Sequence, residues 1–108
     1  MAKSVILADG IQPTVTTAVE LYTSPANGGG TRISAFTASL IAGTETYRVF
    51  IGATATDATE IMPTRSIIGP DSEQPYQVIG QNIGAGDKLF VQVSTGTTIA
   101  FRVTGNEL

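Results

Sequence analysis

The 108-residue sequence contains no cysteine, no histidine and no tryptophan. Without cysteine, the chain forms no disulfide and offers no thiolate to a metal ion or a substrate. Histidine is the commonest general base and a common transition-metal ligand, so its absence removes most enzyme templates. We therefore expect a protein that is not an enzyme and has no catalytic site, no metal site and no cofactor.

Charged residues are also scarce, at 14% of the chain, and the net charge is −3. The basic residues stand singly along the sequence, at Lys3, Arg32, Arg48, Arg65, Lys88 and Arg102. Nucleic-acid binding needs clustered positive charge, so we expect no nucleic-acid partner. Near the start, the apolar run from Val5 to Ala8 is too short for a signal-peptide core or a membrane span, which predicts no membrane partner and synthesis in a cytoplasm.

Threonine, glycine, alanine and valine are abundant, and no stretch carries helical apolar spacing together with good helix formers. Such a composition favours strands and turns. The segment Lys88 to Ser94 alternates Leu89, Val91 and Val93 with polar or mixed positions, and Thr98 to Thr104 repeats the pattern after a turn. Because these segments are consecutive and separated by turn residues, we expect a C-terminal hairpin.

A similar pair occurs earlier, where Thr31 to Leu40 and Thr46 to Ile51 flank a turn around Gly43, and it predicts a second hairpin. Further strands are expected from Val15 to Leu21, and at Ser4 to Leu7, Arg65 to Ile68 and Tyr76 to Ile79. About eight short strands in one domain, residues 1–108, predict an all-β, jelly-roll-like antiparallel β-sandwich. Between them, Thr54 to Pro63 is expected to form a long loop or a single helical turn.

Two features could suggest a reactive site. The glycines between Asn27 and Thr31 lack the Gly-Lys-Ser/Thr ending of a P-loop and are typical of a chain reversal with positive φ. The close carboxylate pairs, Asp57 with Glu60 and Asp71 with Glu73, lack the alternating oxygen ligands of a calcium loop. We expect these acids to be exposed and to serve solubility.

Aromatic residues supply the candidate contact surface. Phe50 lies beside Arg48 and Phe90 follows Lys88, so both phenylalanines fall on the polar face of an expected strand. Such residues indicate either a cover of loops or an interface with a partner. Tyr22 and Tyr76 could extend that interface, because tyrosine is enriched at protein contacts, or they could cap the core.

Several segments resemble small virion proteins of tailed bacteriophages in their strand and turn style. They are Leu21 to Gly28, Thr31 to Ala38, Thr44 to Ile51 and Ile83 to Val91. The resemblance covers most of the chain but contains no catalytic motif and no motif that assigns functional residues. It implies a structural protein of the virion, assembled in the host cytoplasm.

Within that class, the small β-sandwich members resemble capsid decoration proteins, also called cement or staple proteins. The resemblance implies a homo-oligomer, a dimer or a trimer, that binds the phage major capsid protein or other virion proteins and bridges neighbouring subunits. The alternative is a neck, tail or fibre-attachment protein, which would use the same fold with a different partner. A receptor-binding or carbohydrate-binding module is a further alternative, although the sequence has no tryptophan to stack on sugars.

Overall fold

The fold was analysed in a computed structural model, which describes residues 3–108. Strands form where apolar and polar residues alternate, because successive side chains of a strand point to opposite faces. The alternation is strictest in β8, where every second residue is buried. The strands are β1 (Lys3–Ile11), β2 (Val19–Thr23), β3 (Thr31–Leu40), β4 (Thr44–Gly52), β5 (Glu60–Ile68), β6 (Asp71–Glu73), β7 (Asn82–Ile83), β8 (Lys88–Val93) and β9 (Ile99–Glu107).

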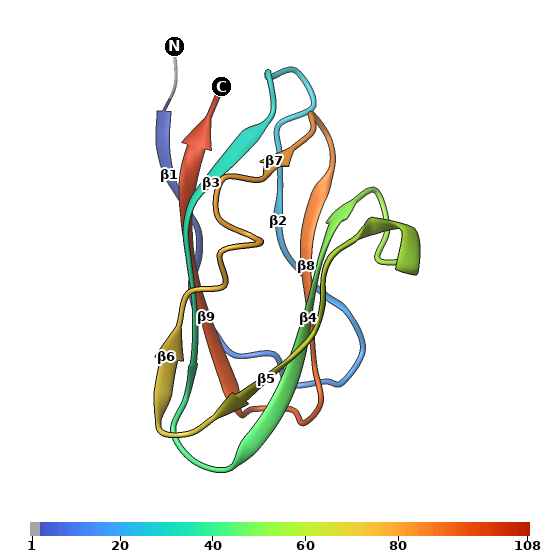
Figure 1. The fold of residues 1–108 in the computed structure, drawn as a ribbon. Coiled ribbons are helices and arrows are strands. Elements are labelled where there is room, and N and C mark those ends of the chain that lie inside the picture. Colours follow the sequence, from blue (N-terminus) through green and yellow to red (C-terminus); the bar gives the residue numbers. More distant parts are fainter. Residues whose placement is uncertain (1–2) are drawn as a thin grey trace.

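These strands form two antiparallel sheets that pack face to face (Figure 1). Sheet A has the order β1-β9-β3-β6, with the short β7 also paired to β3, and sheet B has the order β2-β8-β4-β5. Along the chain, β1, β3, β6 and β9 enter sheet A, whereas β2, β4, β5 and β8 enter sheet B. This crossing between a five-stranded and a four-stranded sheet is the jelly-roll arrangement, so the predicted fold class is confirmed.

The two predicted hairpins are wrong. β9 pairs with β1 and β3, and β8 pairs with β2 and β4, so these consecutive strands lie in different sheets. The same holds for β3 and β4. Alternation marks which face of a strand is buried, but a strand buries that face equally well beside its sequence neighbour or opposite it. The turns at 41–43 and 94–98 therefore carry the chain across the sandwich.

Other segment boundaries also differ from the sequence-based expectations. Residues from Tyr76 to Ile79 form turns instead of a strand, because the amide of Val78 donates to the carbonyl of Pro75 at 3.2 Å. The strand expected from Val15 begins only at Val19, because residues 12–18 cross from sheet A to sheet B. Between Thr54 and Pro63, the expected single helical turn exists as the 3-10 helix η1 (Asp57–Thr59), but Glu60 to Pro63 belong to β5.

The core lies between the sheets and has an aromatic centre. The ring of Phe101 on β9 lies 5.8 Å from that of Phe36 on β3 and 5.6 Å from that of Tyr47 on β4, measured between centroids. Because Tyr47 belongs to sheet B, the second contact joins the layers. Around this centre pack buried aliphatic side chains from both sheets, among them Leu7, Ile33, Leu40, Val49, Met62, Ile67, Leu89, Val91, Val93, Ile99 and Val103.

We expect Phe101→Ala to lower the free energy of unfolding by about 3–5 kcal/mol, because it removes the ring that contacts Phe36 and Tyr47 and leaves a cavity. Urea denaturation of the purified protein measures this loss. Ile6→Ala is the control, since Ile6 is exposed and its truncation should change stability by less than about 0.5 kcal/mol. Equal losses in the two variants would contradict the described core.

Candidate interaction surfaces

The predicted surface residues Phe50 and Phe90 face each other across β4 and β8 on the outer side of sheet B. Only 2% of Phe50 is exposed. The guanidinium of Arg48 lies 5.0 Å from the centroid of the Phe50 ring, a cation–π contact, and Phe90 is half-buried. The structure therefore brings these two residues together, but it leaves Phe50 almost no surface for a partner.

Acidic residues hold the Arg48 side chain in this covering position. Its Nε donates to Glu60 Oε2 at 2.6 Å, and its Nη2 donates to Asp57 Oδ1 at 3.1 Å. This pair of carboxylates, which the sequence placed close together, thus flanks one guanidinium. The arrangement orders the loop before β5 against sheet B.

Tyr22 joins the two sheets near the start of β3. Its hydroxyl donates to Glu107 on β9 and lies 3.1 Å from Thr31 Oγ1, which in turn lies 2.8 Å from the Oγ of the buried Ser24. Burial and the adjacent Glu107 carboxylate raise the pKa of Tyr22. Because β2 belongs to sheet B and Glu107 to sheet A, this network links the layers at one end of the sandwich.

A second link between the sheets was missed by the sequence analysis. The Tyr47 hydroxyl donates to Glu73 Oε1 at 2.5 Å, and Arg65 Nε donates to the same oxygen at 2.6 Å. Glu73 lies on β6 of sheet A, whereas Tyr47 and Arg65 lie on sheet B. Burial, followed by the hydrogen bond to the Glu73 carboxylate, raises the pKa of Tyr47. No sequence motif indicates this pairing, because the partners are 26 and 8 residues from Glu73.

Tyr76 is the predicted contact residue that is open to solvent, with 79% of its surface exposed. It lies in the turns between β6 and β7. Because its ring is exposed and amphipathic, it is suited to contact another protein.

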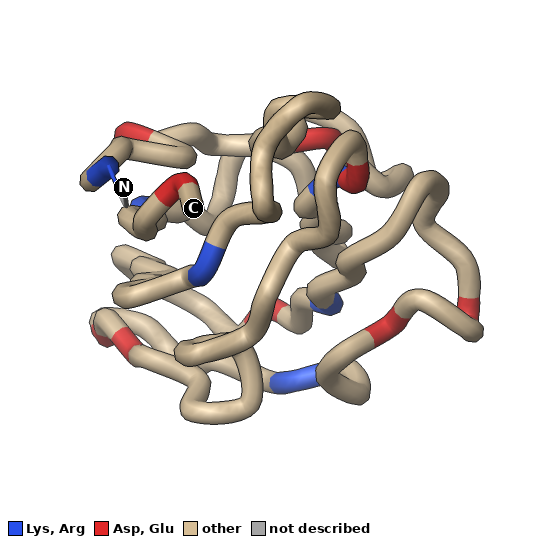
Figure 2. The backbone as a smooth tube through the Cα atoms, turned by 90° about the horizontal axis from the view of Figure 1, so that it is seen from above, with Lys and Arg blue, Asp and Glu red and all other residues tan. Residues whose placement is uncertain are grey.

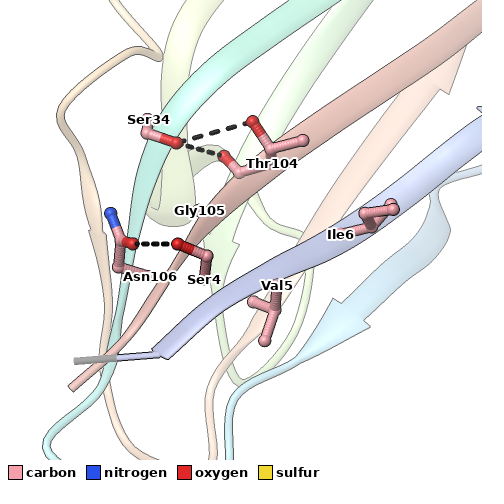
Figure 3. Close-up of a pocket in the computed structure, with 7 residues that line it drawn as sticks. All are labelled: Ser4, Val5, Ile6, Ser34, Thr104, Gly105 and Asn106. Carbon is pink, nitrogen blue, oxygen red and sulfur yellow. Dashed lines mark hydrogen bonds between the residues drawn. The ribbon is translucent and has the colours of Figure 1, made fainter. Parts of the chain in front are cut away.

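The outer side of sheet A forms a second open surface, which we call the sheet A face. Its side chains are small and mostly polar, and a depression of about 280 Å³ lies between β1, β3 and β9. In Figure 3, Ser4 donates to Asn106 Oδ1 at 3.2 Å and Ser34 donates to the carbonyl oxygen of Thr104 at 3.1 Å. The exposed Ile6 adds an apolar side chain to the same depression.

A third surface, which we call the loop end, is formed by the loops 12–18, 41–43, 69–70 and 94–98 at the lower end of Figure 1. Two of these loops are joined by the amide of Gly69, which donates to the carbonyl of Gly43 at 2.8 Å. Ile41 and Ile68 are 85% and 67% exposed here. Sequence reasoning missed both, although each isoleucine stands at a glycine-containing turn, and that position was the available signal.

Charges are spread over the molecule instead of gathered on one side (Figure 2). Ion pairs join Arg48 to Asp57 and Glu60, Arg65 to Glu73, Lys88 to Glu20, and Arg102 to Asp9. Within residues 3–108, Lys3 and Arg32 form no such pair, and no group of three or more acidic side chains is placed to hold a metal ion. No helix in this part of the chain is long and apolar enough to cross a membrane.

No protein-family model and no curated protein matches this sequence. Among solved structures, the chain is similar to a chain of the T13 IBDV viral particle, with a TM-score of 0.51 and 12% sequence identity. The similarity covers 99% of this chain and 30% of that chain, so this protein spans less than a third of the length of the protein that it matches. The comparison shows that a jelly-roll-like sandwich of this kind also occurs within a protein of a virus particle.

The Tyr47 link makes stability depend on pH. Tyr47 stays protonated in the folded protein at pH values where it ionises in the unfolded chain, so above about pH 10 the unfolded state binds fewer protons. Its contribution to stability is therefore complete below pH 10. It is lost as the pH rises toward the higher pKa of the folded state, by at most about 1.4 kcal/mol per pH unit.

We expect Tyr47→Phe to lower the free energy of unfolding at pH 7 by about 1–2 kcal/mol, because it removes the hydrogen bond to Glu73. Above pH 10 the difference between wild type and variant should shrink, since only the wild type loses stability through Tyr47. Urea denaturation at pH 7, 10 and 11 measures both effects. Contributions from the other tyrosines cancel in the difference, because wild type and variant both contain them. A difference that stays constant with pH would contradict the raised pKa.

Proposed function

We propose that this protein is a structural component of a virus particle, and specifically a decoration protein on the capsid of a tailed bacteriophage. The observation that carries the proposal is the jelly-roll sandwich, which is similar over 99% of its length to part of a chain from a virus particle. The resemblance of its segments to small phage virion proteins supports the assignment to a phage. The shortage of reactive side chains agrees with a role that needs binding and no catalysis.

The fold suits such a role because its core is packed and several of its surfaces are exposed to a partner. Two inter-sheet links, Tyr22 to Glu107 and Tyr47 to Glu73, hold the layers together. Among residues 3–108, no segment covers Tyr76, the sheet A face or the loop end. A protein with more than one open surface can touch more than one neighbour, which bridging requires.

Bridging would stabilise a capsid through mass action. A protein that binds the assembled shell but not the separated subunits raises the free energy needed to open the shell. Weak contacts suffice when an oligomer makes several of them at once, because the later contacts form at high effective concentration. The proposed unit is therefore a homo-oligomer bound to major capsid subunits at many equivalent positions.

The test is sedimentation of the purified protein with phage particles assembled without it, followed by thermal disruption of the particles. Saturation at high copy number with a raised disruption temperature supports a decoration protein. Binding only to portal or tail complexes would overturn the capsid position in favour of a neck or tail component. Binding to glycans in the absence of particles would favour a receptor-binding module, and no binding to any of these would overturn the virion role.

In the same assay, we expect Tyr76→Ala to weaken binding to particles about tenfold, because exposed tyrosines often supply a large share of binding energy at protein interfaces. Tyr76→Phe keeps the ring and serves as the matched control, with binding close to that of the wild type. Equal binding by wild type and Tyr76→Ala would remove Tyr76 from the contact surface.

A further inference from the structure

The loop end combines exposed apolar side chains with negative charge. Ile41 belongs to loop 41–43 and Ile68 ends β5 just before loop 69–70, and the Gly69 to Gly43 hydrogen bond joins these two loops. Asp71 follows directly after loop 69–70, and Glu45 is the second residue of β4 after loop 41–43. Neither acid forms an ion pair among the described residues. The surface therefore fits a partner that offers apolar contact and positive charge.

The sheet A face of the same chain offers both. Its depression is lined by Val5 and Ile6 together with hydroxyl and amide side chains. Arg32 lies on β3, where it pairs in register with Asn106 of β9, a residue that lines the depression. On the same outer side, Arg102 and Asp9 form an ion pair at 2.5 Å. Arg32 is exposed and forms no ion pair among residues 3–108, so it adds an unpaired positive charge to this face.

We propose that copies of this protein associate head to tail, with the loop end of one copy on the sheet A face of the next. Ile41 and Ile68 contact the depression beside Ile6, and Asp71 approaches Arg32 of the neighbouring copy. The contact buries apolar side chains that are otherwise exposed. It also brings unpaired charges of opposite sign on the two surfaces together. This inference goes beyond the proposed function, because it depends only on surfaces of this chain.

The charges argue against the simpler two-fold contact between loop ends. In such a contact Asp71 and Glu45 would face the same acids of the second copy, and like charges brought together at an interface are unfavourable. A head-to-tail contact uses different surfaces on the two copies, so it closes into a ring if the rotation between copies allows it and otherwise extends. Of the two predicted oligomers, this contact therefore favours the trimer over the two-fold dimer.

The test is sedimentation equilibrium of the purified protein alone, over a range of concentrations and at low and high salt. We expect the wild type to self-associate and the association to weaken as salt rises, because the contact includes exposed charges. Ile41→Ser, Asp71→Arg and Arg32→Asp should each weaken association about tenfold or more. All three residues lie at exposed or turn positions, and urea denaturation confirms that each variant is folded.

The double variant Asp71→Arg with Arg32→Asp exchanges the two charges and should regain most of the association. Ala58→Ser, a substitution at an exposed residue of η1 outside both surfaces, is the control and should associate like the wild type. A wild type that stays monomeric at all concentrations would overturn the proposal. Association that Arg32→Asp leaves unchanged would overturn it too. Because no virus particle takes part, neither result depends on the proposed function.

Discussion

The contact between Phe101 of β9 and Tyr47 of β4 is the interaction on which the rest of the sandwich depends, because it joins the sheets at the centre of the core. Phe101 packs within sheet A on Phe36, and Tyr47 extends to the rim of the core, where its hydroxyl reaches Glu73. One tyrosine therefore contributes both to apolar packing and to a polar link between layers. Such a residue fixes the relative position of the sheets, which apolar contacts alone restrict less sharply, since hydrogen bonds are directional and apolar burial is not.

The outer sides of the two sheets differ in a way that bears on function. Sheet B carries large side chains outside, and the chain covers them itself, with Arg48 over Phe50 and with acids from η1 and β5 around the guanidinium. Sheet A carries serine, threonine and alanine, and no segment of the described chain covers its depression. A face of small side chains allows another surface to approach closely, whereas the outer side of sheet B is covered by the chain's own side chains.

The proposed function depends on open surfaces of the sandwich. The carboxylates that could have formed an acidic site are used structurally, Asp57 and Glu60 around Arg48 and Glu73 between Tyr47 and Arg65. Three residues that form no ion pair among residues 3–108 lie on the two open surfaces, Arg32 on the sheet A face and Asp71 and Glu45 at the loop end. The proposal of head-to-tail association rests on this division between charges that hold the fold and charges that are free to meet a partner.

The sequence by itself determined the fold class, the approximate positions of most strands and the shortage of catalytic residue types, because alternation and composition are local properties. Only the tertiary structure decided that β8 and β9 lie in different sheets, that Phe50 is covered while Tyr76 is open, and that Tyr47 finds Glu73. The physical reason is that a period of two residues defines which face of a strand is buried but carries no information about its neighbours. Pairing, cover and polar links depend on how the crossing loops bring distant segments together.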